Sequence, residues 1–125
     1  MITVLNILLV EDNPGDIRLL QEILREVGTT EYQITPAMTL AAAIDRLSIS
    51  DPVPFDIILL DLSLPDSLGM ASFLSLHRQA PQIPIVVLTG LDDEMLALSA
   101  MQQGAQDYLI KGQVDCHLLR RSIRY

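Results

Sequence analysis

The run Phe55-Asp-Ile-Ile-Leu-Leu60 is apolar almost throughout, and it is followed at once by Asp61. Runs of the same character occupy residues 6–10, 85–89 and 107–110. Unbroken apolar runs of this length are typical of strands buried on both faces, as in parallel sheets. A weaker strand is expected at residues 32–37, and Pro36 favours the edge of the sheet for it.

Segments with helical periodicity lie between these runs. One apolar stripe at helical spacing consists of Ile17, Leu20, Ile23, Leu24 and Val27. Asn13 is placed to cap that helix, with Pro14 at its first position, Asp16 in its first turn and Gly28 at its end. Further helices are expected at about residues 39–47, 70–79, 93–103 and 115–124. The alternation of strand and helix repeats five times and predicts an α/β domain, with a central parallel sheet and helices on both faces.

For the helix expected at residues 93–103, helical geometry predicts which side chains face the sheet. We expect Leu98 to face the sheet, with Met95 and Met101 about 60° to either side of it. Leu96 and Ala100 then lie about 160° from Leu98, on the face expected to meet solvent.

Composition excludes several classes of protein. The chain has 125 residues, of which 50% are hydrophobic, and a formal net charge of −8. An acidic surface repels phosphate backbones, so direct binding of nucleic acid is not expected. The single cysteine, Cys116, excludes an internal disulfide, and no apolar run reaches the length of a membrane span. With no basic leader before an apolar stretch, the expected location is cytoplasmic.

The chain reads as one domain over residues 1–125, because it contains no linker-like stretch and no repeat. Its last helical pattern stops abruptly at Arg124-Tyr125, without a cap or a polar tail. We therefore expect this domain to be excised from a longer, multidomain protein.

Polar and charged residues follow the predicted strands at corresponding ends. They are Glu11 and Asp12 after the first strand, Asp61 after the third, Thr89 and Gly90 at the end of the fourth, and Lys111 after the fifth. Ligands of an open parallel sheet bind beyond the carboxyl ends of its strands. Any one of these residues alone would be read as a solvated turn residue, because most charged side chains lie in solvent.

Three carboxylates on one rim repel each other unless positive charge compensates them. Lys111 supplies one charge, and a bound divalent cation would supply two more. Oxygen ligands without histidine or cysteine indicate a hard ion, for which Mg²⁺ is the first candidate and Mn²⁺ the second.

Four motifs, in this order, resemble those of the response-regulator receiver family over essentially the whole chain. They are Val10-Glu-Asp-Asn13, Leu60-Asp-Leu-Ser-Leu-Pro65 with Gly69 beyond, Leu88-Thr-Gly90, and Gly104-Ala-Gln-Asp-Tyr-Leu-Ile-Lys111. An acidic pair alone would be a weak signal, whereas four motifs in the right strand context are very specific. The resemblance implies a flavodoxin-like fold with strand order 2-1-3-4-5, which places the carboxylates at the crevice where the order reverses.

The resemblance also implies a role for each position in a two-component phosphorelay. Asp61 resembles the phosphoacceptor, which takes a phosphoryl group from a phosphohistidine of a sensor kinase or a histidine phosphotransfer protein. Asp12, Asp61 and the backbone carbonyl of Ser63 resemble the Mg²⁺ ligands, and Glu11 would act through water in the outer shell. Lys111 resembles the cation that neutralises the phosphoryl oxygens.

The remaining implied roles belong to the switch. Thr89 resembles the hydroxyl that moves to the phosphoryl group, and Tyr108 occupies the position of the aromatic residue that turns inward with it. Gly90 is similar to the small residue that leaves the phosphoryl group room. The resemblance implies that phosphorylation changes the surface near the fourth helix and fifth strand, where a homodimer or partner would form. Such a domain accepts and slowly loses one phosphoryl group, and is not a turnover enzyme.

The residue after Lys111 departs from the family pattern. The family usually has proline after the lysine, often with a cis peptide, whereas this chain has Gly112. A cis bond before a residue other than proline costs about 3 kcal/mol, which disfavours that geometry here. Glycine reaches backbone angles closed to other residues, so the loop can still turn sharply.

Three alternatives use the same fold or nucleophile. A flavin-binding redox module is disfavoured because Glu11 and Asp12 would repel a flavin phosphate and no Ser/Thr-Gly-rich phosphate loop follows the first strand. A phosphatase-like hydrolase with an aspartyl nucleophile normally has a second Asp two residues later, where this chain has Ser63. A degenerate receiver used only for docking is disfavoured by the complete set of acidic, hydroxyl and lysine positions.

Overall fold

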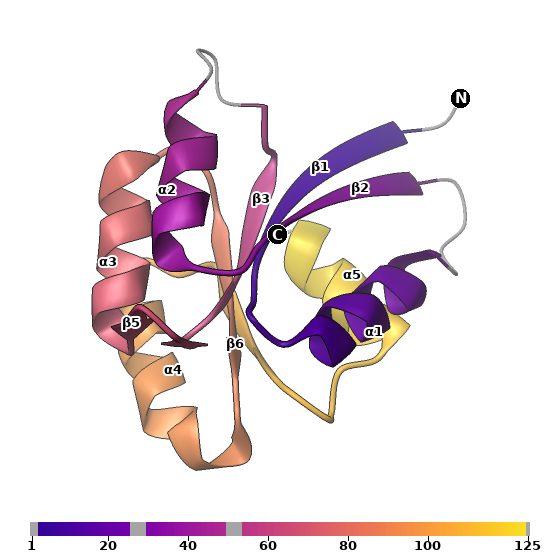
Figure 1. Cartoon of the computed structure of the whole chain (residues 1–125). Coiled ribbons are helices and arrows are strands. Elements are labelled where there is room, and N and C mark those ends of the chain that lie inside the picture. Colours follow the sequence, from indigo (N-terminus) through magenta and orange to yellow (C-terminus); the bar gives the residue numbers. More distant parts are fainter. Residues whose placement is uncertain (1–2, 26–29, 50–53, 125) are drawn as a thin grey trace.

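A five-stranded parallel sheet forms the centre of the protein (Figure 1). The structure is a computed structural model and describes residues 3–25, 30–49 and 54–124. The strands are β1 (Thr3–Val10), β2 (Thr30–Ala37), β3 (Ile57–Asp61), β6 (Ile85–Thr89) and β7 (Asp107–Ile110). Their spatial order is β2-β1-β3-β6-β7, which confirms both the predicted strand order and the edge position of the strand that carries Pro36.

Helices cover both faces of the sheet, as predicted (Figure 1). On one face lie α1 (Pro14–Arg25) and α5 (Cys116–Arg124), and on the other lie α2 (Leu40–Ser48), α3 (Met70–Gln79) and α4 (Glu94–Gln102). Successive side chains of a strand point to opposite faces. Leu8 and Ile58 therefore pack in the cluster beneath α2, α3 and α4, whereas Ile7 and Ile57 pack in the cluster beneath α1 and α5. Burial of each such side chain contributes about 1.5–3 kcal/mol, so both faces of the sheet stabilise the fold.

Helix α1 forms as the sequence predicts. The Asn13 side chain caps it, because Asn13 Oδ1 accepts hydrogen bonds from the backbone N–H of Gly15 at 2.8 Å and of Asp16 at 3.2 Å. Leu20 and Leu24 of the predicted stripe are buried against the sheet. Val27 and Gly28 lie outside the described residues.

The predicted orientation of α4 is wrong. Ala97 and Ala100 are fully buried, whereas Leu98 is 43% exposed and Met95 is 78% exposed. Leu96, which was expected in solvent, packs against the core. The buried face of this helix is thus offset from the face that its largest side chains predict.

Small side chains explain this orientation of α4. The helix lies against α3, β6 and β7, and alanines let its backbone approach these neighbours closely. A short 3-10 helix, η1 (Leu91–Asp93), precedes it. Because α4 carries apolar residues on several sides, periodicity alone could not decide which side faces the sheet.

Met101, the remaining member of the expected stripe, does pack against the core.

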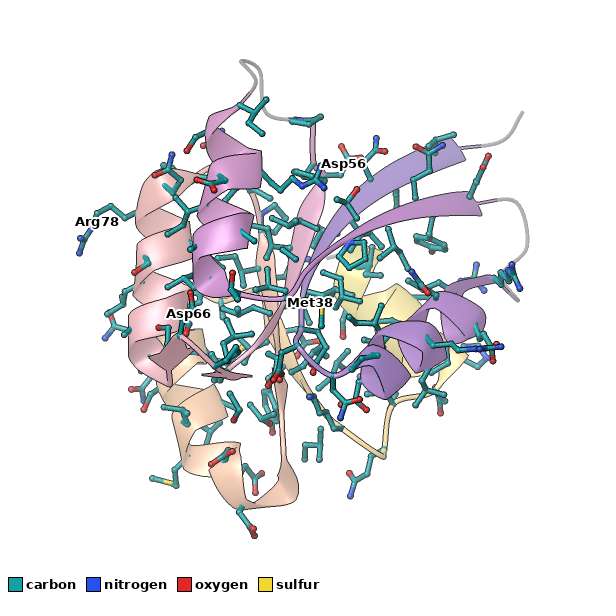
Figure 2. The ribbon with its side chains drawn as sticks, in the orientation of Figure 1. Met38, Asp56, Asp66 and Arg78 are labelled. Atoms are coloured by element: carbon teal, nitrogen blue, oxygen red, sulfur yellow. The ribbon has the colours of Figure 1, made fainter. Side chains whose placement is uncertain are left out.

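A small antiparallel hairpin follows Asp61 and was not predicted. Its strands are β4 (Ser63–Leu64) and β5 (Ser67–Leu68), with Pro65 and Asp66 at the turn. The Asp66 carboxylate accepts hydrogen bonds from the backbone N–H of Leu40 at 2.8 Å and of Ala41 at 3.0 Å. Figure 2 shows Asp66 beside the first turn of α2. The loop that follows Asp61 is therefore tied to a neighbouring helix.

Among the described residues, no helix combines the length and the apolar character needed to cross a membrane.

Candidate functional site

Three acidic side chains meet at the carboxyl ends of β1 and β3. Glu11 and Asp12 follow β1, and Asp61 is the last residue of β3. One carboxylate oxygen of each lies within 4.8 Å of the others. Glu11 and Asp61 are buried, whereas Asp12 is partly exposed. The structure thus brings together the three carboxylates that the sequence predicted to share one rim.

Lys111 reaches this cluster from the end of β7. Its Nζ lies 2.7 Å from Glu11 Oε2 and 3.0 Å from Asp61 Oδ2. It also lies 3.1 Å from Oδ2 of Asp16, a residue that the sequence placed only in the first turn of a helix. Its contact with Glu11 Oε2 is the shortest of these three ion pairs. One ammonium group therefore serves three carboxylates.

Burial and charge shift the ionisation of this cluster. Burial raises the pKa of Glu11 to about 7, although Lys111 opposes this shift, and repulsion from Asp61 adds to it. Burial also works against the charge on Lys111. The carboxylates of Glu11, Asp61 and Asp16 outweigh burial, and the pKa of Lys111 is raised above its ordinary value. Lys111 is therefore a permanent cation, whereas Glu11 takes up a proton near neutral pH.

Both oxygens of Asp61 have partners. Oδ2 contacts Lys111, and Oδ1 accepts a hydrogen bond from the backbone N–H of Ser63 at 3.0 Å. The second bond fixes the start of β4 to the acidic side chain, which keeps the peptide group of Ser63 next to the cluster. The role of the Ser63 carbonyl as a metal ligand stays a prediction.

Thr89 ends β6 beside this cluster, as predicted. It is buried, and its Oγ1 has no hydrogen-bond partner within the part of the chain that the structure describes. Its backbone carbonyl accepts a hydrogen bond from the Lys111 N–H at 2.8 Å, which joins the ends of β6 and β7. A buried hydroxyl without a partner costs about 1–3 kcal/mol. Such a group is a candidate for binding something that arrives at the site.

The two other predicted switch positions lie near Thr89. Gly90 is exposed and has an ordinary backbone conformation, and a Cβ added there would lie 3.9 Å from Asp93 Oδ2, an ordinary contact. Packing therefore does not require glycine at this position. Tyr108, on β7, packs against the same core cluster as Leu96 of α4. The strand and the helix that were expected to form one surface are thus in contact through the core.

Comparison with known proteins agrees with this geometry. The profile of the response regulator receiver domain matches residues 7–123. This chain belongs to the response regulator receiver family. It is similar to the swarming motility regulation protein RssB of Serratia marcescens, with 33% identity over 107 residues, or 86% of this chain and 46% of that protein. The receiver domain described here therefore spans less than half the length of that relative.

Solved structures share the fold. A response regulator receiver domain protein from Clostridium thermocellum superposes with a TM-score of 0.83 at 22% identity, covering 96% of this chain and 91% of that one. The Mn²⁺-bound form of response regulator Rcp1 gives a TM-score of 0.75 at 29% identity, covering 95% of this chain and 89% of that one. The first likeness concerns the fold alone, and the second is to a response regulator whose structure contains a metal ion.

Gly112 determines the shape of the turn that follows Lys111. Gly112 has a φ of +86°, and the Gln113 N–H donates to the Ile110 carbonyl at 3.0 Å. Lys111 has a negative φ, and a four-residue turn with a positive φ at its third residue alone is of type II, which favours glycine there. Proline is restricted to a φ near −65°, so the usual residue of the family could not replace Gly112 in this turn. The sharp turn expected from Gly112 is confirmed.

The donor set fits a hard divalent cation. Glu11, Asp12 and Asp61 offer only carboxylate oxygens, and their negative charges exceed the single charge of Lys111. Mg²⁺ and Mn²⁺ bind such oxygens in preference to softer ligands. The cluster can therefore hold a metal, and the choice of ion belongs to the proposal below.

Proposed function

We propose that this receiver domain is a phosphorylation switch in a two-component phosphorelay. In this proposal Asp61 accepts a phosphoryl group from a phosphohistidine of a sensor kinase or a histidine phosphotransfer protein. The observation that carries the proposal is the convergence on Asp61 of the Lys111 ammonium, 3.0 Å away, and the carboxylates of Glu11 and Asp12. A docking module without phosphorylation would not need this charge arrangement.

The transfer is a displacement at phosphorus. An oxygen of the Asp61 carboxylate forms the new P–O bond while the P–N bond of the phosphohistidine breaks, and the imidazole leaves with the bonding electrons and takes up a proton. Asp61 loses its negative charge when it becomes an acyl phosphate. One N–H of Lys111 then donates its hydrogen bond to a phosphoryl oxygen in place of the Asp61 oxygen, because the negative charge now lies on the phosphoryl group.

Asp12 and Asp61, with the carbonyl of Ser63, would hold Mg²⁺ directly, and Glu11 would act through water in the outer shell. Mn²⁺ is the alternative ion. When bound, the metal supplies positive charge that neutralises the phosphoryl oxygens. The domain takes up one phosphoryl group in each cycle and later loses it by hydrolysis, so it is not a turnover enzyme.

The unpartnered hydroxyl of Thr89 supports a switch. A phosphoryl oxygen on Asp61 gives this buried donor a hydrogen-bond acceptor, which favours movement of Thr89 toward Asp61. Tyr108 and Leu96 pack against one core cluster, and in this proposal the movement of Thr89 changes that packing and so reaches α4. Partner or homodimer affinity at α4 and β7 then depends on phosphorylation.

Substitution Asp61→Asn tests the phosphoacceptor. We expect the wild-type protein to gain one phosphoryl group from acetyl phosphate and Mg²⁺, and the variant to gain none, as measured by intact-protein mass spectrometry. Asp45→Asn, at an exposed position of α2, is the matched control and should be phosphorylated like the wild type. Circular dichroism checks that both variants keep the fold. Phosphorylation of the Asp61→Asn protein at the wild-type rate would exclude Asp61 as the acceptor.

Substitution Leu98→Asp tests the output surface. Leu98 is exposed on α4, so we expect stability to change by less than about 0.5 kcal/mol and phosphorylation to be unaffected. Association of the phosphorylated protein with itself or with a partner should weaken, as measured by analytical ultracentrifugation and pull-down. Leu74→Asp, at an exposed position of α3, is the control and should associate normally. Equal association of the two variants would place the output surface elsewhere.

A further inference from the structure

Within the described part of the chain, Lys111 has one ion-pair partner outside the acidic cluster. Its Nζ donates a hydrogen bond to Asp16 Oδ2 at 3.1 Å and another to Asp61 Oδ2 at 3.0 Å. Glu11, Asp12 and Asp61 form the group whose oxygens can surround a metal, and Asp16 is not a member of it. Asp61 and Glu11 are therefore shared between the ammonium and any cation at the cluster, whereas Asp16 contacts the ammonium from outside that group.

Asp16 is well placed to hold a side chain still. It lies in the first turn of α1, and its backbone N–H donates to the Asn13 cap at 3.2 Å. The amino end of a helix also favours a negative charge. The side chains of Asp16 and Lys111 are 36% and 28% exposed, so their contact lies where the site opens to solvent. Among the described residues of α1, Asp16 is the one whose side chain accepts a hydrogen bond from this ammonium.

We propose that Asp16 is a positioning residue. It holds the Lys111 ammonium at the site while the Asp61 carboxylate is converted into an acyl phosphate. This inference rests on the function proposed above. Acylation removes the negative charge from the Asp61 oxygen and releases one N–H of Lys111. A second N–H stays on Asp16, so the ammonium turns toward the phosphoryl oxygen and is not lost to water. The contact thus connects α1 with the loop after β7.

Phosphorylation kinetics test this role. We expect Asp16→Asn to slow phosphorylation by acetyl phosphate and Mg²⁺ about fivefold, the factor that corresponds to about 1 kcal/mol in a barrier. Asp16→Glu keeps a carboxylate within reach of Lys111 and should restore most of the rate. Glu22→Gln removes the same charge from an exposed position of the same helix and should match the wild type. An Asp16→Asn protein that is phosphorylated as fast as the wild type, or faster, would overturn the proposal.

A second measurement does not depend on phosphorylation. Lys111 is the single lysine of the chain, so selective ¹⁵N-lysine labelling yields one side-chain ammonium signal. An ammonium held by carboxylates exchanges its protons slowly with water. We expect its Nζ–H cross-peak in the wild-type and Glu22→Gln proteins, with and without Mg²⁺. In Asp16→Asn it should be lost when Mg²⁺ is present.

The two measurements separate two kinds of failure. A wild-type protein that takes no phosphoryl group would contradict the proposed function, and the ammonium signal would still decide the role of Asp16. A signal of equal intensity in the Asp16→Asn and wild-type proteins, both with Mg²⁺, would refute the positioning role even if Asp61 is phosphorylated.

Discussion

Glu11 and Asp66 are both carboxylic acids near the rim of the sheet, and their ionisation is shifted in opposite directions. Glu11 is buried beside Lys111 and Asp61, and burial is the main cause that raises its pKa to about 7. Asp66 is exposed, and hydrogen bonds from the N–H of Leu40, then of Ala41, hold its pKa below the ordinary value. Hydrogen-bond partners and access to water therefore decide the direction of each pKa shift. Glu11 can gain or lose a proton near neutral pH, whereas Asp66 stays ionised and holds the hairpin against α2.

Loss of the Lys111 charge should change the free energy of unfolding more than a substitution of Glu11 or Asp66 does. Lys111→Met keeps the length of the side chain but leaves Glu11, Asp16 and Asp61 without their shared cation. We expect a loss of about 3 kcal/mol in the free energy of unfolding at pH 8 without metal, because buried charge is left uncompensated. Urea unfolding followed by circular dichroism measures this loss.

The control for this substitution is Arg78→Met, which removes a positive charge from α3. Figure 2 shows Arg78 pointing away from the protein, so its loss should change stability by less than about 0.5 kcal/mol. If both variants lose the same stability, net charge matters and the contacts of Lys111 do not.

The dependence of stability on pH separates Glu11 from the other acids. Its pKa rises from 4.5 to about 7 on folding, so its contribution is fully present below pH 4.5 and is lost as the pH rises through 7. Relative to the wild type, Glu11→Gln should therefore gain on the order of 2 kcal/mol between pH 4.5 and pH 8 without metal. Urea unfolding at several pH values tests this, with Glu22→Gln as the control. Parallel curves for wild type and Glu11→Gln would contradict the raised pKa.

Asp66 should show the smallest effect, with the opposite dependence on pH. Each of its oxygens accepts one backbone N–H, and an Asn side chain has only one acceptor oxygen, so Asp66→Asn loses one of two bonds. We expect a drop in melting temperature at pH 7 that shrinks as the pH falls below the ordinary value of 3.8. Asp45→Asn, on the exposed side of α2, should melt like the wild type.

The family resemblance predicted the order of the sheet, and the apolar stripe of α1 predicted which face of that helix is buried. In α1 the stripe residues Leu20 and Leu24 are large, and Asn13 marks the start of the helix. In α4 the buried residues are Ala97 and Ala100, so the large apolar residues predicted the wrong buried face for this helix. Periodicity therefore orients a helix only when its buried residues are also its most hydrophobic ones.

Some residues of the candidate site could likewise be predicted from the sequence, and others could not. Glu11, Asp61 and Lys111 could be predicted because the ends of parallel strands meet at one rim, whatever the loops do. Asp16 and Asp66 were missed because their contacts depend on how one loop meets a helix or strand distant in sequence. One signal did exist for Asp16, since the first turn of a helix that follows β1 must begin near the end of that strand.

Pro36 gives β2 a property that matters when many copies of the chain are close together. The Ala37 carbonyl accepts from the Glu11 N–H at 3.0 Å, so the polar groups of Ala37 point toward β1. Neighbouring residues of a strand present their polar groups to opposite sides, and those of Pro36 therefore face the free edge, where proline has no N–H to offer. A strand from another molecule would meet a missing donor there. Pro36 thus protects an open sheet edge from aggregation at no cost to the internal ladder.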